Sequence, residues 1–136
     1  PETQPIMMRL NSDLIGLCSL AVDGELDKAT IDFDKRAAVG VVMAAGGYPG
    51  SYAKGEVISG LNADFEENVK VFHAGTSLNN DDVVTSGGRV LCVTALGDTV
   101  TEAQAKAYQG LANISWNGVE YRKDIAFRAI ERENNA

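Results

Sequence analysis

Basic side chains near the C-terminal end are the first residues whose types and spacing suggest chemistry. Arg122 and Lys123 are adjacent, and Arg128 follows them, in a protein whose formal net charge is −7. Guanidinium and ammonium groups match the oxygens of a phosphate, so one interpretation is a phosphate clamp. The alternative is a set of surface salt bridges with Asp124 and Glu131, which would contribute little to stability. Spacing alone favours this alternative.

One histidine and two cysteines are further side chains of intrinsic reactivity. His73 lies in a segment typical of a strand, where a lone histidine is more often a hydrogen-bonded structural group than a catalytic base. No serine or cysteine partner is marked out for it. Cys18 and Cys92 both lie in apolar runs, so we expect buried, reduced thiols, as in a cytoplasmic protein. None of these three residues is therefore predicted to be catalytic.

Three aspartates lie in the acidic segment Leu26–Lys35, at positions 27, 32 and 34. Closely spaced carboxylates suggest a metal site, but no glycine-defined calcium loop follows them. We therefore interpret the segment as a solvated link between a helix and a strand. Two isolated cysteines do not make a metal site either, so we predict no metal ligands in the chain.

The composition indicates a folded domain and argues against two classes of function. A chain of 136 residues is enough for one domain. Its acidic balance has no compensating basic stripe, which argues against a nucleic-acid partner. No apolar segment is long enough to span a bilayer, and the start shows no signal-peptide pattern, so we expect no membrane partner and a cytoplasmic location.

The elements that must position these residues are organised around the segment from Arg36 to Gly60. The apolar run Ala37–Ala45 predicts a strand buried on both faces. Glycines and a proline in residues 46–50 predict a tight turn, because glycine permits positive φ and proline lacks an amide hydrogen. A second short strand is expected at residues 56–58.

A helix is expected to precede this segment and to carry one wide apolar stripe. It starts near Pro5 and stops at Asp23-Gly24. The stripe is formed by Ile6, Met7, Leu10, Leu14, Leu17, Cys18 and Ala21. A stripe of this width needs a partner surface. We therefore expect the chain to be a piece of a longer one, whose N-terminal part supplies some of that surface.

The remainder of the sequence alternates strand and helix patterns. Strands are expected at residues 69–76, 83–85 and 89–96, with Ser86-Gly87-Gly88 as the turn of a hairpin and the last of these strands at the centre of a sheet. Thr99 and Glu102 form a capping box before a helix with an alanine-rich stripe. A short strand within residues 116–121 and a helix at residues 126–133 complete the chain.

Five segments, taken in order, carry a family resemblance. They are PETQPIMMRL at the start, AAVGVVMAAGGYPGSY, VFHAGT, TSGGRVLCVTALG and YRKDIAFRAIERE. Together they resemble the phosphoribosylamine–glycine ligases, which are ATP-grasp enzymes of purine biosynthesis. The resemblance runs from residue 1 to about residue 133 and covers the family's C-terminal third. Before the aromatic residue of KDIAFR, the family more often has glycine where this chain has Ala126.

This resemblance implies an α+β fold, an antiparallel sheet with packed helices. Residues 1–30 are similar to the last helix of the central ATP-grasp domain, and residues 31–136 to the C-terminal domain. The implied reaction joins glycine to 5-phosphoribosylamine with ATP and Mg²⁺ (or Mn²⁺), through a glycyl phosphate. The family residues that bind most of the nucleotide and the metal lie upstream of this sequence. The missing N-terminal domains are therefore implied partners, and the chain alone is expected to be inactive.

The resemblance also implies roles for particular residues. Arg122 and Lys123, in the matching RKDI motif, are candidates for holding the 5-phosphate of the sugar amine. Glu2, in PETQ, is a candidate for binding or orienting substrate, with an ordinary helix-start carboxylate as the alternative. Residues Gly46, Gly47 and Tyr48 are candidates for lining a domain interface.

Two hypotheses follow for the chain as a whole. In the first, it is part of a ligase and does not turn over alone, which predicts an exposed apolar face on residues 6–21 or its burial against a partner. In the second, it is a stand-alone, non-catalytic binding module that keeps the fold, which predicts that this face is folded into the chain's own core.

Overall fold

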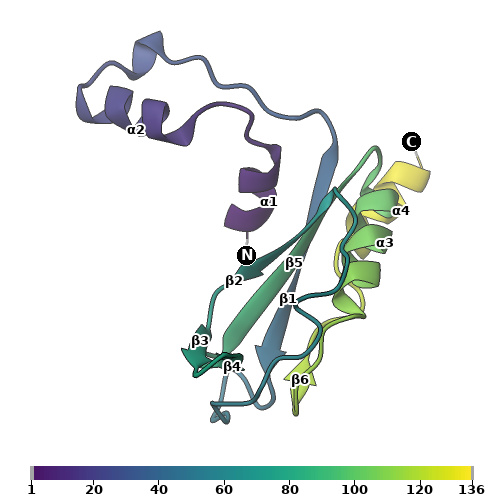
Figure 1. Cartoon of the computed structure of the whole chain (residues 1–136). Coiled ribbons are helices and arrows are strands. Elements are labelled where there is room, and N and C mark those ends of the chain that lie inside the picture. The colour runs from purple at the N-terminus through teal and green to yellow at the C-terminus, as the bar shows by residue number, and fades with distance from the viewer. Residues whose placement is uncertain (1, 136) are drawn as a thin grey trace.

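The computed structural model describes residues 2–135 as an antiparallel sheet with helices on both faces (Figure 1). Four strands lie in the order β2-β5-β1-β6, and every pairing is antiparallel. Their bounds are Val69–His73 for β2, Arg89–Gly97 for β5, Ala37–Ala45 for β1 and Val119–Glu120 for β6. The mixed α+β architecture and the central position of β5 are therefore confirmed.

One face of the sheet holds the core beneath helix α3 (Val100–Leu111). Val39, Val41 and Met43 of β1 are buried there, and so are Ala103 and Ala107 of the helix. The N-cap at Thr99 is confirmed, since the backbone N–H of Glu102 donates to the Thr99 hydroxyl at 3.1 Å. The Glu102 carboxylate reaches back as expected, but to Asp98 N at 2.8 Å, one residue before the cap. Small alanines let the helix lie close to the strands.

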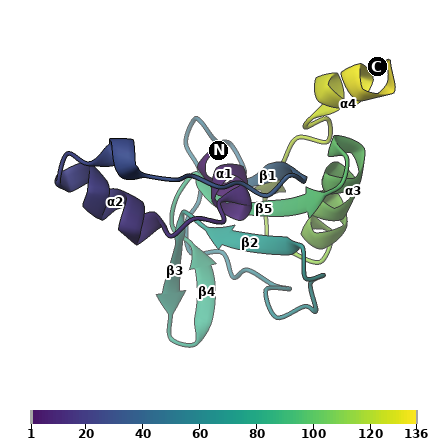
Figure 2. The same ribbon diagram turned by 90° about the horizontal axis from the view of Figure 1, so that it is seen from above.

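The opposite face of the sheet is only partly covered, by helix α1 (Thr3–Arg9), as Figure 2 shows. Along β1, buried residues alternate with half-buried ones, so the expectation of burial on both faces is wrong. A Cβ placed on Gly40 would lie 3.1 Å from Pro5 Cγ, which places α1 directly over the glycine. We call this half-covered surface the open face.

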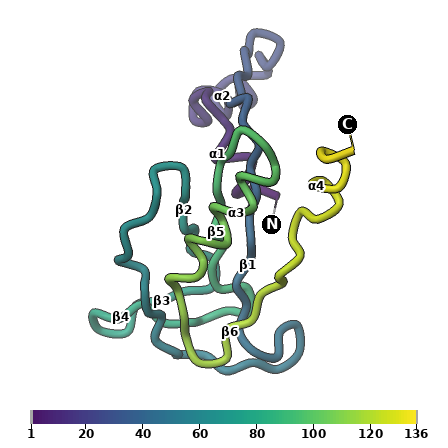
Figure 3. The backbone as a smooth tube through the Cα atoms, turned by 90° about the vertical axis from the view of Figure 1, so that its right-hand side faces the viewer, coloured from purple at the N-terminus to yellow at the C-terminus, as the bar shows by residue number. Residues whose placement is uncertain are grey.

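The N-terminal segment forms two helices, which corrects the expectation of one. Helix α1 ends at Arg9, and α2 (Leu14–Val22) begins after Asp13, whose carboxylate accepts from Ile15 N and Gly16 N. Such a cap satisfies amides that a continuous helix would bond internally, so Asp13 favours a new helix start. Helix α2 and the short 3₁₀ helix η1 (Leu26–Lys28) project away from the sheet (Figure 3). Cys18, on α2, is exposed rather than buried.

Strands β3 (Thr76–Asn79) and β4 (Asp82–Thr85) form a separate two-stranded sheet. The predicted hairpin between β4 and β5 is therefore wrong. Ser86 N and Gly87 N both donate to Gly75 O, and a Cβ on Gly75 would lie 2.7 Å from Gly87 Cα. The glycines thus serve a close crossing of two backbones between the sheets.

Residues 56–58 form no strand, and only Val57 makes an isolated bridge, to Val84. The strand expected at residues 69–76 is divided, since β2 ends at His73 and β3 begins at Thr76 in the other sheet. The remaining elements agree with expectation. Residues 46–50 form a turn that contains a cis Tyr48–Pro49 bond, and α4 spans Phe127–Asn134.

Candidate functional site

Two grooves on the open face meet along β1. The first, which we call the sheet groove, has a volume of about 500 Å³ and is lined by Gly40, Val42, Ala44, Tyr48, Arg89, Glu120, Tyr121, Arg122 and Ile125. The second, which we call the α1 groove, has a similar volume of about 500 Å³. It is lined by Thr3, Gln4, Val42, Tyr48, Ala74, Gly75, Gly88, Arg89, Leu91 and Cys92. Val42, Tyr48 and Arg89 belong to both.

A β-bulge brings Arg89 to this face. The register of β1 with β5 runs Val42↔Cys92 and Met43↔Leu91, then shifts to Ala44↔Arg89, so Val90 is an extra residue. Strict alternation from Cys92 would place residue 89 on the α3 side. The inserted residue returns Arg89 to the face of Cys92 and Val42, as bulges beside functional sites commonly do.

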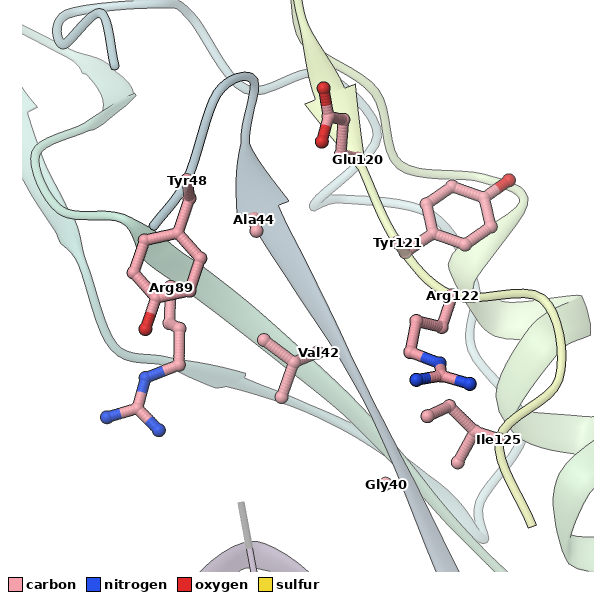
Figure 4. Close-up of a pocket in the computed structure, with 9 residues that line it drawn as sticks. All are labelled: Gly40, Val42, Ala44, Tyr48, Arg89, Glu120, Tyr121, Arg122 and Ile125. Atoms are coloured by element: carbon pink, nitrogen blue, oxygen red, sulfur yellow. The ribbon is translucent and has the colours of Figure 1, made fainter. Parts of the chain in front are cut away.

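Arg122 lies across the sheet groove from Arg89 (Figure 4). Its guanidinium donates to both carboxylate oxygens of Asp124, at 2.8 and 2.6 Å. This pairing raises the pKa of Arg122 and lowers the pKa of Asp124. The predicted salt bridge with Asp124 is therefore present, and it presents Arg122 at the groove with 71% of its side chain exposed.

The segment that carries Arg122 is held by helix α3. The Tyr108 hydroxyl donates to the carbonyl oxygen of Arg122 and accepts from Ile125 N, while the Gln104 amide donates to Ile125 O at 2.7 Å. These contacts fix the loop between β6 and α4, which has no other regular structure.

Tyr48 comes to both grooves from the turn after β1. Tyr48 is 39% exposed, and its ring packs on the backbone of Gly88, where no side chain intervenes. The neighbouring ring of Tyr52 lies 6.2 Å from it, centroid to centroid. The turn therefore places a rigid aromatic wall beside the guanidinium of Arg89 (Figure 4).

The other predicted residues lie outside the grooves. Glu2 precedes α1 without a side-chain cap bond, next to the groove-lining Thr3, and Arg89 acts electrostatically on its carboxylate. Lys123 is exposed and lines neither groove. Neither do Gly46 and Gly47, whose backbones pack on Gly118 and Ser51 respectively.

Sequence reasoning missed Arg89 and Glu120 as groove residues. A signal for Arg89 exists, namely a charged residue directly after two glycines at the start of an otherwise apolar strand. His73 behaves as the structural interpretation expects, since its Nδ1 lies 3.0 Å from the Thr76 hydroxyl. Burial raises the pKa of the Cys92 thiol, so the α1 groove has a neutral wall there.

Within residues 2–135, no cluster of histidine, cysteine, aspartate or glutamate has the arrangement of a metal site. No helix in this range has the length and apolar character needed to cross a bilayer. The grooves can thus bind anions through their arginines and apolar or aromatic groups through the groove floor.

Comparison with known proteins finds relatives along nearly the whole chain. A phosphoribosylamine–glycine ligase of Vibrio cholerae is 62% identical over 133 residues, which is 98% of this chain and 31% of that protein. The ligase of Escherichia coli K12 is 59% identical over 136 residues, covering 99% of this chain and 32% of that protein. The chain therefore spans about a third of the length of these curated relatives.

A solved structure agrees with the fold. The crystal structure of phosphoribosylamine–glycine ligase from Thermotoga maritima superposes with a TM-score of 0.64 at 32% identity, over 80% of this chain and 27% of that one. Residues 38–128 match the sequence model described as phosphoribosylglycinamide synthetase, C domain, and this range includes both grooves apart from the α1 residues. The chain belongs to the phosphoribosylglycinamide synthetase C-domain family.

Proposed function

We propose that this chain is the C-terminal part of a ligase that joins glycine to 5-phosphoribosylamine at the expense of ATP, in purine biosynthesis. The observation that carries the proposal is the sheet groove, which Arg122 and Arg89 line on either side of an apolar floor. The relatives named phosphoribosylamine–glycine ligase, of which this chain spans about a third, support the choice of substrates. A cytoplasmic location accords with this function.

The proposed reaction has two steps. A carboxylate oxygen of glycine attacks the γ-phosphorus of ATP, the bond to the β–γ bridging oxygen breaks, and ADP leaves. The amine of phosphoribosylamine then attacks the acyl carbon of glycyl phosphate, the carbon–oxygen bond breaks, and inorganic phosphate leaves with loss of one amine proton. Both steps build negative charge on phosphoryl oxygens, which fixed cations stabilise in a site closed to water.

In this proposal Arg122 binds the 5-phosphate of the sugar amine. A guanidinium matches phosphate oxygens in a bidentate geometry, and Asp124 holds this one at the rim of the groove. Lys123 adds positive charge from outside the groove. Tyr48 and Val42 offer the apolar surface on which a sugar ring packs.

ATP and its Mg²⁺ are assigned to the part of the ligase that precedes this chain, because the described residues do not fit a metal ion. We assign residues 1–30 to the end of the ATP-grasp domain and residues 31–136 to the C-terminal domain. Exposed apolar side chains on α1 and α2 support a covering partner, since Ile6, Leu14, Ile15 and Val22 are 46–87% exposed. The missing N-terminal domains are that partner in our proposal.

The test is ADP formation that depends on both glycine and phosphoribosylamine. We expect turnover from the full-length ligase and none from residues 1–136 alone. In the full-length enzyme, Arg122→Ala should raise the KM for phosphoribosylamine by roughly 10-fold or more, as expected for loss of hydrogen bonds to a charged group, and spare that for ATP. Turnover by the 136-residue chain would reject the fragment assignment, and an unchanged KM would remove Arg122 from the site.

A further inference from the structure

We infer that the α1 groove binds glycine and that Arg89 holds the anionic end of this substrate, first as the carboxylate and then as the acyl phosphate. The inference rests on the proposed function and deepens it. It divides the open face into two substrate sites, with the sugar phosphate in the sheet groove and the amino acid beneath α1. Arg89 belongs to both grooves and marks the place where the two substrates meet.

Arg89 differs from Arg122 in the availability of its guanidinium N–H donors. Within residues 2–135, Arg89 is exposed and its side chain makes no hydrogen bond or short ion pair, whereas Arg122 is bonded to both oxygens of Asp124. An arginine offers five N–H donors in a planar fork that fits a carboxylate or a phosphoryl group. The bulge at Val90 is what aims this fork at the open face.

The walls of the α1 groove suit a small ligand. Ala74, Gly75 and Gly88 line it with little or no side chain. Cys92 adds a neutral thiol. A groove with small walls and a cation can admit a compact acid such as glycine, while a larger amino acid side chain would have to compete with the ring of Tyr48.

The ammonium group of glycine needs an acceptor, and Gln4 offers one. Gln4 lines the α1 groove, and its buried Oε1 accepts no hydrogen bond from the described part of the chain. A buried acceptor without a donor costs free energy that an incoming N–H group recovers. Arg89 and Gln4 thus supply a cation and an acceptor, as a zwitterion with a carboxylate and an ammonium group requires.

The position of Arg89 also suits the second step of the proposed reaction, in which the amine attacks the acyl phosphate. Val42, Tyr48 and Arg89 are shared by both grooves, so an acyl group held at Arg89 lies next to the sheet groove, where the amine is bound. A guanidinium is a delocalised cation with donors in a planar fork, so Arg89 can stabilise the added charge of the acyl phosphate. Bringing the two reactants together at one boundary lowers the entropic cost of amide formation.

The experiment is steady-state kinetics of the full-length ligase carrying Arg89→Gln, with Arg122→Gln for comparison and Arg132→Gln as control. Arg132 is exposed on α4, outside both grooves. We expect Arg89→Gln to raise the KM for glycine by roughly 10- to 100-fold and to lower kcat, with the KM for phosphoribosylamine within about twofold. Arg122→Gln should show the opposite pattern, and Arg132→Gln should change neither constant.

Gln4→Leu tests the acceptor for the ammonium group of glycine and should also raise the KM for glycine. Arg89→Lys should restore part of the glycine affinity, because it keeps the charge but loses the planar fork. Circular dichroism and the melting temperature establish that each variant is folded. An Arg89→Gln enzyme that binds glycine normally, or that loses only phosphoribosylamine affinity, overturns the inference. If the unsubstituted enzyme shows no turnover dependent on both substrates, the proposed function itself fails.

Discussion

The Tyr108 hydroxyl donates a hydrogen bond to the carbonyl oxygen of Arg122 at 2.6 Å. The same hydroxyl accepts from Ile125 N at 3.1 Å, so one phenol on α3 closes the loop that carries the arginine. Helix α3 is anchored in turn by the core, where Ala103, Ala107 and Leu111 are buried against the sheet. The groove face of the molecule is therefore tied to the core through Tyr108.

Tyr108→Phe removes both hydrogen bonds and keeps the ring. We expect the 136-residue chain to lose about 1–2 kcal/mol of unfolding free energy, the usual contribution of one or two such bonds. In the full-length ligase we expect a higher KM for phosphoribosylamine, because the Arg122 loop loses its fixed position. Urea unfolding and steady-state kinetics measure the two effects. Tyr52→Phe is the control, since no hydrogen bond of the described residues involves the Tyr52 hydroxyl. Equal effects of Tyr108→Phe and Tyr52→Phe would contradict the view that the Tyr108 hydroxyl holds the loop that carries Arg122.

Ala126 adopts a left-handed backbone conformation, with φ +68° and ψ +4°, at the start of α4. A Cβ is unfavourable there, whereas glycine adopts this region freely. Ala126→Gly should therefore raise the unfolding free energy by roughly 0.5–1 kcal/mol, after allowance for the greater entropy of glycine in the unfolded chain. The opposite sign is expected for Ala129→Gly, which places glycine within the helix and costs about 1 kcal/mol. Denaturant unfolding of the two variants compares them, and destabilisation by Ala126→Gly would contradict the argument.

Local signals made much of the sheet-and-helix framework predictable. Apolar runs mark β1 and β5, and Thr99 with Glu102 marks the start of α3, because each depends on neighbouring residues alone. The departure from the family at Ala126 was also visible in the sequence, although its consequence depends on a backbone angle. The prediction of a single N-terminal helix was wrong. It followed the periodic apolar spacing and did not take account of Asp13, which caps the start of a second helix.

Most of the structural features that the sequence did not predict depend on pairing between distant segments. The glycines at 87 and 88 have the composition of a hairpin turn, but Gly87 makes a close crossing with Gly75, twelve residues away, and Gly88 lies against the ring of Tyr48. Arg89 was missed for a similar reason, since its direction depends on a one-residue register shift against β1. A period-two pattern read along one strand cannot reveal a bulge that is defined by the partner strand.

Glu133 links α4 to the N-terminus of α3 and makes this contact depend on pH. Its carboxylate accepts from Val100 N at 2.8 Å, Thr101 N at 3.1 Å and the Thr101 hydroxyl at 2.8 Å. These hydrogen bonds lower the pKa of Glu133 below its ordinary value of 4.5. The carboxylate is thus stabilised in the folded state, so its contribution is complete above the unfolded pKa and is lost as the pH falls through the folded pKa.

We therefore expect Glu133→Gln to destabilise the chain at neutral pH, and the difference from the unsubstituted chain to shrink as the solution becomes more acidic than pH 4.5. Urea unfolding at a series of pH values measures this difference. Glu131→Gln is a matched control on the same helix, because the described contacts of Glu131 use its backbone carbonyl and not its carboxylate. A Glu133→Gln difference that stays constant across this pH range would show that the carboxylate hydrogen bonds do not contribute as described.

Gly88 and Tyr48 offer a test of the wall shared by the two grooves. A Cβ on Gly88 would overlap Cδ2 of the Tyr48 ring, so Gly88→Ala must displace the ring or the strand. We expect this substitution to destabilise the chain by about 1–3 kcal/mol, the usual cost of overpacking, and to reduce kcat/KM of the full-length ligase. In a Tyr48→Ala background the overlap is absent, so the added cost of Gly88→Ala should fall to well under half. A double-mutant cycle in urea unfolding measures this coupling, and strictly additive costs would mean that the ring does not rest on the glycine.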